Sequence, residues 1–177
     1  MTNNAINKMK VLKVENEIQF LLVKSLLKEY IASLPLYLNS SDLKKELDYF
    51  DREYNTIHLE CAVPFGFMLL ALHDNKTAAA CIALKKINAE ICELKRLYVK
   101  PRFRKNGLGR ILCMTAIEKA VKMGYKKMVL ETCSTMVEAI ALYKSIGFRE
   151  YKQSTLHRIH DTLHMELAWT NEQEIKK

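Results

Sequence analysis

A short basic segment with two glycines is the part of this 177-residue chain best suited to bind an anion. It reads Arg104-Lys105-Asn106-Gly107-Leu108-Gly109-Arg110 and stands between a strand-like run and a helix-like run. Glycines at a helix start let backbone N–H groups come close to a ligand, and the helix N-terminus adds unpaired donors and partial positive charge. The segment therefore predicts a cradle for a pyrophosphate, to which the basic side chains add full charges.

This pattern differs from the two commonest phosphate-binding loops. The string G-x-x-x-x-G-K-S/T does not occur, and Leu112 stands where a dinucleotide fingerprint has its third glycine. The alternative interpretation is a tight turn at Gly107 and Gly109 that carries solvated arginines.

Two motifs together resemble the GNAT superfamily of N-acetyltransferases. Arg104-x-x-Gly107-x-Gly109, after a strand ending in Leu97-Tyr98-Val99, resembles its acetyl-CoA-binding motif. Ala139-x-x-Leu142-Tyr143-x-x-x-Gly147-Phe148 resembles its next helix and strand. The resemblance covers nearly the whole chain and is specific over residues 93–148. It implies an enzyme that transfers an acetyl group from acetyl-CoA, without a metal, to a primary amine by direct attack in a ternary complex.

The resemblance also implies a role for each site residue. The Leu97 N–H would polarise the thioester carbonyl and stabilise the oxyanion. Tyr143 would protonate the departing thiolate, and Glu93 occupies the position of a general base in some members. Cofactor-binding residues would be Leu97, Val99, Arg104, Lys105, Asn106, Gly107, Leu108, Gly109 and Arg110. Met136 stands where many relatives have an asparagine that touches the cofactor, so one polar contact is undefined.

Each proposed proton-transfer residue also has a purely structural interpretation. Lys95 and Arg96 adjoin Glu93, and their charges favour its ionised form, so Glu93 is either a base or a member of a surface ion pair. Tyr143 follows an apolar run and is otherwise a buried tyrosine with a hydrogen-bonded hydroxyl. Its family position favours the acid role.

Other polar residues give weaker signals. His157, His160 and His164 lie close together, but their spacing does not favour a metal site, and they are candidates for lining the acceptor pocket. Tyr37 is a further acceptor-side candidate. Cys133 is the cysteine nearest to a covalent relay, yet no basic residue adjoins it. The five cysteines form no C-x-x-C pair, which indicates a reducing compartment.

The periodicity of apolar residues predicts the elements that position this segment. We expect helices at residues 16–30, 42–52, 108–123 and 135–146, the last with a capping box from Thr135 to Glu138. Strands are expected at 67–72, 77–84, 91–99, 128–131, 148–151 and 163–168, with a further short strand at 10–14. This order predicts an α/β, GNAT-like single domain over residues 1–170, with a central mixed, mostly antiparallel sheet flanked by helices and a polar tail at 171–177.

The formal charge of +8 comes from 28 basic and 20 acidic residues. Seven basic residues and no acidic one fall between Lys95 and Arg110, which favours a phosphorylated cofactor over nucleic acid. The alternative is a basic interaction module that binds RNA or protein, with CoA absent or only regulatory. No signal peptide or membrane span is evident, so we expect a cytoplasmic protein with no membrane partner. We expect the acceptor to be a small-molecule or peptide amine, and a homodimer is left open.

Overall fold

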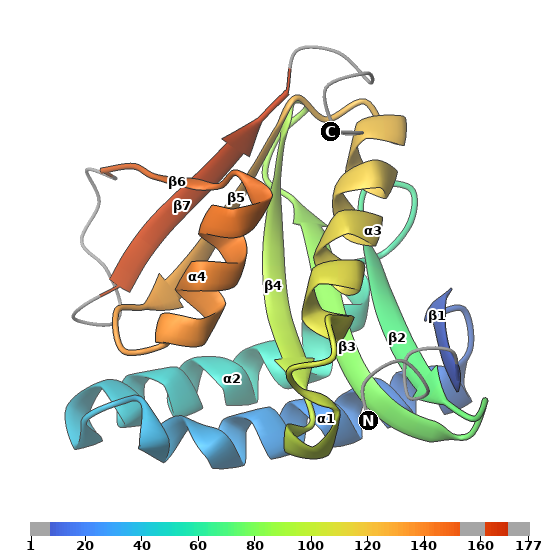
Figure 1. The fold of residues 1–177 in the computed structure, drawn as a ribbon, viewed down its shortest axis with the longest axis horizontal. Helices are drawn as coiled ribbons and strands as arrows, with labels where there is room; N and C mark the ends of the chain where they lie inside the picture. Colours follow the sequence, from blue (N-terminus) through green and yellow to red (C-terminus); the bar gives the residue numbers. More distant parts are fainter. Residues whose placement is uncertain (1–7, 153–161, 170–177) are drawn as a thin grey trace.

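The computed structural model describes residues 8–152 and 162–169, whose strands form one seven-stranded sheet in the order β1-β2-β3-β4-β5-β7-β6 (Figure 1). Neighbouring strands are antiparallel except β4 and β5, which are parallel. The strands are β1 (Met9–Lys13), β2 (Phe67–His73), β3 (Thr77–Lys86), β4 (Ile91–Val99), β5 (Lys127–Cys133), β6 (Arg149–Glu150) and β7 (Thr162–Ala168). The predicted mixed, mostly antiparallel sheet is confirmed. The predicted polar tail lies outside the described residues.

Helices cover both faces of this sheet (Figure 1). They are α1 (Glu17–Ser33), α2 (Ser40–Glu60), α3 (Leu108–Lys122) and α4 (Val137–Ile146), with 3-10 turns η2 (Leu34–Leu36) and η3 (Pro101–Phe103). Alternate residues of β2 enter opposite cores: Leu69 packs in the cluster that includes α3, and Leu70 packs in the cluster that includes α1 and α2. A strand buried on both faces explains why β2 is a continuous apolar run.

Two local expectations are corrected by the structure. Helix α2 continues to Glu60 rather than ending near residue 52, because its buried face continues through Glu53 and Ile57. That face contains carboxylates, so it lacks a continuous apolar stripe. The capping box at Thr135 does not form: the N-cap of α4 is Met136, and the Thr135 hydroxyl donates to the Tyr37 carbonyl at 2.7 Å.

The centre of the sheet opens between β4 and β5. These strands pair only from Ile91–Lys127 to Glu93–Val129 and diverge beyond that point (Figure 1). On the other side of β4, Cys81 pairs with Tyr98 but Ala83 pairs with Lys95, so one residue of β3 faces two of β4. This β-bulge contains Arg96, whose φ of +57° is left-handed.

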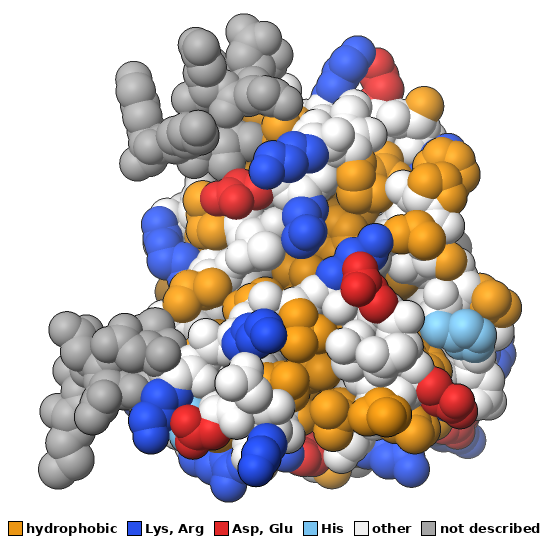
Figure 2. Space-filling model, turned by 90° about the vertical axis from the view of Figure 1, so that its right-hand side faces the viewer, with side chains coloured by type: hydrophobic (Ala, Val, Ile, Leu, Met, Phe, Trp, Pro, Cys, Tyr) orange, Lys and Arg blue, Asp and Glu red, His pale blue; other side chains and the backbone are white. Residues whose placement is uncertain are grey.

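Basic side chains are scattered among apolar and acidic ones over the described part of the face in Figure 2 and form no single band there. None of the helices built from described residues is long and apolar enough to cross a membrane.

Candidate active site

Two adjoining hollows lie where β4 and β5 diverge. A groove of about 820 Å³ runs along the end of β4, the η3–α3 loop and the start of α4. A smaller pocket of about 140 Å³ lies between β4 and β5 and is closed by residues of α1 and α2. Tyr30, Leu97, Met136 and Ala139 line both hollows, so a ligand in the groove can reach one in the pocket.

The basic loop forms one wall of the groove. Lys105 and Gly107 have φ values of +61° and +77°, and this left-handed geometry turns the chain into α3. The first intrahelical bond from α3 runs from Ile111 N–H to the Gly107 carbonyl, so the amides of Leu108, Gly109 and Arg110 precede it. The groove is lined by every predicted cofactor-binding residue except Asn106.

Side-chain contacts fix the loop to its surroundings. Arg104 Nε donates to the Val99 carbonyl at 2.9 Å, and Arg110 Nη1 donates to Ser145 Oγ at 2.9 Å. A Cβ at Gly109 would lie 3.3 Å from Leu142 Cδ2, so this glycine also lets α3 approach α4 closely. The loop is thus held between the end of β4 and α4, the two elements that bound the groove.

The backbone at Leu97 faces the opening between the strands. The Arg96 carbonyl accepts a hydrogen bond from Cys81 Sγ at 3.7 Å and therefore points toward β3. In a trans peptide the next N–H points the opposite way, so the Leu97 N–H is directed away from β3. Because β5 has diverged at this level, that donor faces the hollows rather than a neighbouring strand.

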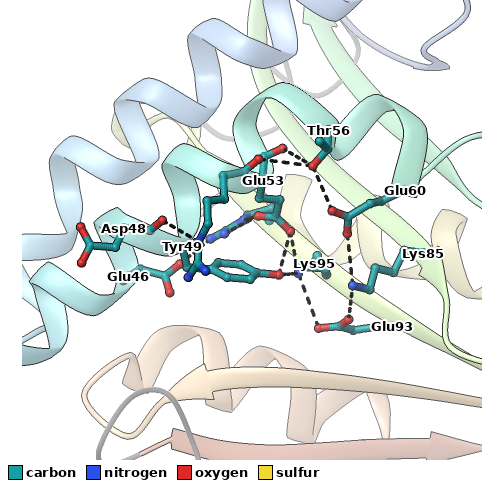
Figure 3. Close-up of polar contacts among 11 residues, drawn as sticks. Glu46, Asp48, Tyr49, Glu53, Thr56, Glu60, Lys85, Glu93 and Lys95 are labelled. Carbon is teal, nitrogen blue, oxygen red and sulfur yellow. Dashed lines mark hydrogen bonds and ion pairs between the residues drawn. The ribbon is translucent and has the colours of Figure 1, made fainter.

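Tyr143 and Glu93 both line the pocket. The Tyr143 side chain is buried, packs edge-on against Phe148 at 5.8 Å between ring centroids, and has a pKa raised well above its usual 10.0 by burial. Glu93 lies at the last β4–β5 pair, 3.8 Å from Lys85 and 4.0 Å from Lys95 (Figure 3). Burial raises the pKa of Glu93 despite these two lysines. The neighbouring charges do favour its ionised form, as expected, because Lys95 and Lys85 each lower this pKa, but burial outweighs them.

Three of the seven clustered basic residues are paired with acidic residues of the N-terminal helices. Lys95 pairs with Glu53 at 2.6 Å, Arg96 pairs with Glu46 at 2.7 Å, and Lys100 pairs with Glu29 at 2.7 Å. All three acids come from α1 or α2, more than 40 residues from these cations in the sequence. The positive charge that has no acidic neighbour in the sequence is thus partly neutralised by acids brought close in the fold. Arg104, Lys105 and Arg110 are the basic residues of this cluster that line the groove.

The acceptor-side candidates lie at different places. Tyr37 lines the groove, and Cys133 lines the pocket. His164 is buried with Nδ1 3.7 Å from a Glu131 carboxylate oxygen, whereas His157 and His160 lie outside the described residues. Within residues 8–152 and 162–169, no three potential His, Cys, Asp or Glu ligands gather around one point. Met136 lines both hollows and accepts from the Thr132 hydroxyl at 3.8 Å, so a thioether occupies the asparagine position.

Sequence reasoning did not identify the residues of α1 and α2 that line the pocket. Tyr30, Glu46 and Tyr49 line it, and the Tyr30 pKa is raised to about 12, chiefly by burial. The available signal was the spacing of Glu46 and Glu53, seven residues apart on one helical face.

Comparisons with known proteins agree with this geometry. Residues 25–148 match the family described as "Acetyltransferase (GNAT) family". An uncharacterized N-acetyltransferase of Schizosaccharomyces pombe is 34% identical over 145 residues, which cover 81% of this chain and 85% of that protein. An acetyltransferase from Streptococcus agalactiae has a TM-score of 0.74 at 18% identity, covering 92% of this chain and 99% of its own. The PaiA N-acetyltransferase from Thermoplasma acidophilum, solved in complex with coenzyme A, has a TM-score of 0.72 at 18% identity, covering 91% and 99%.

Proposed function

Because the chain belongs to the GNAT acetyltransferase family, and is thus an N-acetyltransferase, we propose that it transfers an acetyl group from acetyl-CoA directly to a primary amine in a ternary complex. One observation carries this proposal: the cofactor-sized groove and the pocket meet at Leu97, the residue whose N–H faces the opening between β4 and β5. Two substrates bound in the two hollows would have their reacting atoms at that junction.

The groove fits the chemistry of coenzyme A. The amides at the start of α3, together with Arg104, Lys105 and Arg110, suit a pyrophosphate. Val99 and Leu97 then lead from this cradle to the pocket, so the pantetheine arm would run along the exposed backbone edge of β4. The relative solved with coenzyme A supports the same ligand class here.

The pocket supplies groups for each proton and charge in acyl transfer. Glu93, directly or through a water, takes a proton from the bound ammonium, and the neutral amine attacks the thioester carbonyl carbon. The carbonyl oxygen gains negative charge as the C–N bond forms, and the Leu97 N–H donates to it. When the carbonyl re-forms and the C–S bond breaks, Tyr143 donates its proton to the thiolate, and the proton that the new amide nitrogen loses returns to the Tyr143 oxygen, directly or through a water. With a pKa above its usual 10.0, the phenol is protonated at neutral pH before that step.

An amine panel with acetyl-CoA, read as released thiol, tests the proposed reaction. The panel includes polyamines, amino acids, aminoglycosides and peptide N-termini, because the pocket is to take a small-molecule or peptide amine. We expect thiol release with at least one class and an acetylated product of matching mass. Calorimetric titration with acetyl-CoA accompanies it, and the proposal is overturned if there is neither binding heat nor thiol release.

A further inference from the structure

Arg96 has an unusual position for a charged side chain. It has a left-handed φ of +57° inside β4, and its side chain is only 6% exposed. A non-glycine residue in this conformation is costly and persists only where its surroundings hold it. The peptide group that follows Arg96 carries the Leu97 N–H, so the conformation of Arg96 sets the direction of that donor.

Two carboxylates of α2 hold the guanidinium. Arg96 Nε donates to Glu53 Oε2 at 2.7 Å and Nη1 donates to Glu46 Oε1 at 2.7 Å, while Nη2 also pairs with Glu53. Glu46 and Glu53 are seven residues apart, about two helical turns, and so face the same side of α2. Three aromatic rings surround the guanidinium. Its carbon, Arg96 Cζ, lies 5.8 Å from the ring centroid of Tyr30, 5.6 Å from that of Tyr49 and 5.4 Å from that of Phe50.

Glu53 also couples the bulge to the preceding residue. Lys95 Nζ lies 2.6 Å from Glu53 Oε1 and donates to the Tyr49 hydroxyl at 2.7 Å (Figure 3). In a regular strand, successive side chains point to opposite faces, so Lys95 and Arg96 would not meet one carboxylate. Here both reach Glu53, and Leu94 and Leu97 pack in the core on the other face. The contacts to Glu53 therefore need the bulge, and the bulge is held by them.

Glu53 is ionised in this setting. Burial by itself would raise its pKa, but the charges of Arg96 and Lys95 outweigh burial and lower it. A buried ion pair is often no more stabilising than apolar residues of the same volume, so its presence beside a site suggests a geometric role. Its geometry fixes one backbone direction, that of the peptide between Arg96 and Leu97.

We propose that Glu46 and Glu53 act through Arg96 as positioning residues, holding the β4 bulge so that the Leu97 N–H points at the thioester carbonyl of acetyl-CoA. This inference rests on the proposed acetyl transfer and adds to it a connection from α2 to the oxyanion donor. Misplacing a reacting group by about 1 Å can cost on the order of 100-fold in rate, so a rigid support for this donor has a direct catalytic effect.

The test uses acetyl-CoA labelled with carbon-13 at the acetyl carbonyl, because a hydrogen bond to that carbonyl lowers its infrared stretching frequency. The variants are Arg96→Met, Arg96→Lys and Glu53→Gln. The control is Glu90→Gln, which changes a residue in an exposed ion pair with Lys126.

In Arg96→Met we expect the bound carbonyl band to move up toward its value in free acetyl-CoA. We also expect kcat, measured by thiol release with the best amine of the panel, to fall about 10- to 100-fold. Affinity for acetyl-CoA should stay within about twofold, since no phosphate contact changes. Arg96→Lys should recover part of both effects, and Glu90→Gln should match the wild type.

Each outcome decides between the inference and its alternatives. A folded Arg96→Met with the wild-type carbonyl band and kcat overturns the positioning role. If circular dichroism shows that Arg96→Met is unfolded, Glu46→Ala gives the same readout, because it removes the acceptor of Arg96 Nη1 and leaves Glu53 with both cations. An unchanged band in a folded Glu46→Ala would then contradict the inference. A wild-type protein that does not bind acetyl-CoA overturns the proposed function itself, which separates the two failures.

Discussion

At the scale of single residues, Tyr143 and Glu93 owe their raised pKa values to the same cause. Both line the pocket between β4 and β5, and burial penalises the charged form of each. The consequence differs with the group. A carboxyl with a raised pKa becomes a stronger base, whereas a phenol with a raised pKa stays protonated but becomes a weaker acid. Burial therefore favours Glu93 as a base, and Tyr143 is expected to release its proton only as the thiolate forms beside it.

Tyr143→Phe should lower kcat by about 100-fold with little change in KM for acetyl-CoA, because it removes a proton donor that acts only as the thiolate departs. Steady-state kinetics with the best amine measure both constants. Phenylalanine keeps the edge-on contact with Phe148, so the melting temperature serves as a check on packing. A variant with wild-type kcat would remove Tyr143 from the mechanism.

If Glu93 is the general base, kcat/KM should fall at acidic pH, which gives an acidic limb in its pH profile. Below its pKa the carboxyl is protonated and cannot accept a proton, so activity should rise as pH increases through a pKa above 4.5. Glu93→Gln should lower kcat/KM and abolish that limb, as seen in profiles measured at saturating acetyl-CoA. If the limb persists unchanged in Glu93→Gln, another group or a water relay titrates instead.

At the scale of elements, the sequence predicted the helices and strands whose buried residues are apolar and recur with a regular period. The strands of the meander and α3 have nearly their predicted bounds, and Gly124, with φ +88°, follows α3 as expected. Helix α2 was predicted too short because Glu46 and Glu53 occupy its buried face. Their partners are on β4, and a contact that pairs residues 53 and 96 leaves no local trace in the chain.

The direction of a side chain in β4 depends on the bulge. In a regular strand the side chains of Lys95 and Arg96 would point to opposite faces of the sheet. From the sequence alone, both residues therefore count among the cations expected around the anion site. The bulge turns both toward α2. The glycine-containing loop could be singled out from the sequence because its backbone geometry is local, whereas the lining of the pocket depends on pairing between residues that are far apart in the sequence.

Gly107→Glu should lower the affinity for acetyl-CoA by at least tenfold, because the new carboxylate lies at the groove and repels the phosphates. Its left-handed φ of +77° adds a strain of about 1–2 kcal/mol. Gly124→Glu is the matched control: its φ is +88°, no heavy atom lies within 4 Å of an added Cβ, and it lines neither hollow. Both variants should lose similar stability in thermal melts, and calorimetry should show weakened binding only for Gly107→Glu. Equal affinities would contradict the cradle.

At the scale of the whole molecule, the fold determines which of the cations behind the charge of +8 have acidic partners, and their order in the sequence does not show this. Acids from α1 and α2 match Lys95, Arg96 and Lys100, while Arg104, Lys105 and Arg110 remain around the α3 N-terminus. A protein that follows a nucleic-acid backbone needs a row of such cations. A compact group at a helix start suits one small polyanion instead.

This distribution predicts how ligands change the stability of the whole protein. A ligand that binds only the folded state, present at 100 times its Kd, adds about 2.7 kcal/mol to the free energy of unfolding, which for a chain of this size corresponds to about 5–10 °C in Tm. Acetyl-CoA should therefore raise the melting temperature by several degrees in differential scanning calorimetry. Acetyl-pantetheine at the same concentration should raise it much less, because it shares the thioester arm but lacks the pyrophosphate proposed to bind at the start of α3.

Generic RNA should leave Tm unchanged at 150 mM salt. A large shift with RNA that vanishes as salt increases, and none with acetyl-CoA, would instead support a basic interaction module, since counterion release makes such binding steeply salt-dependent.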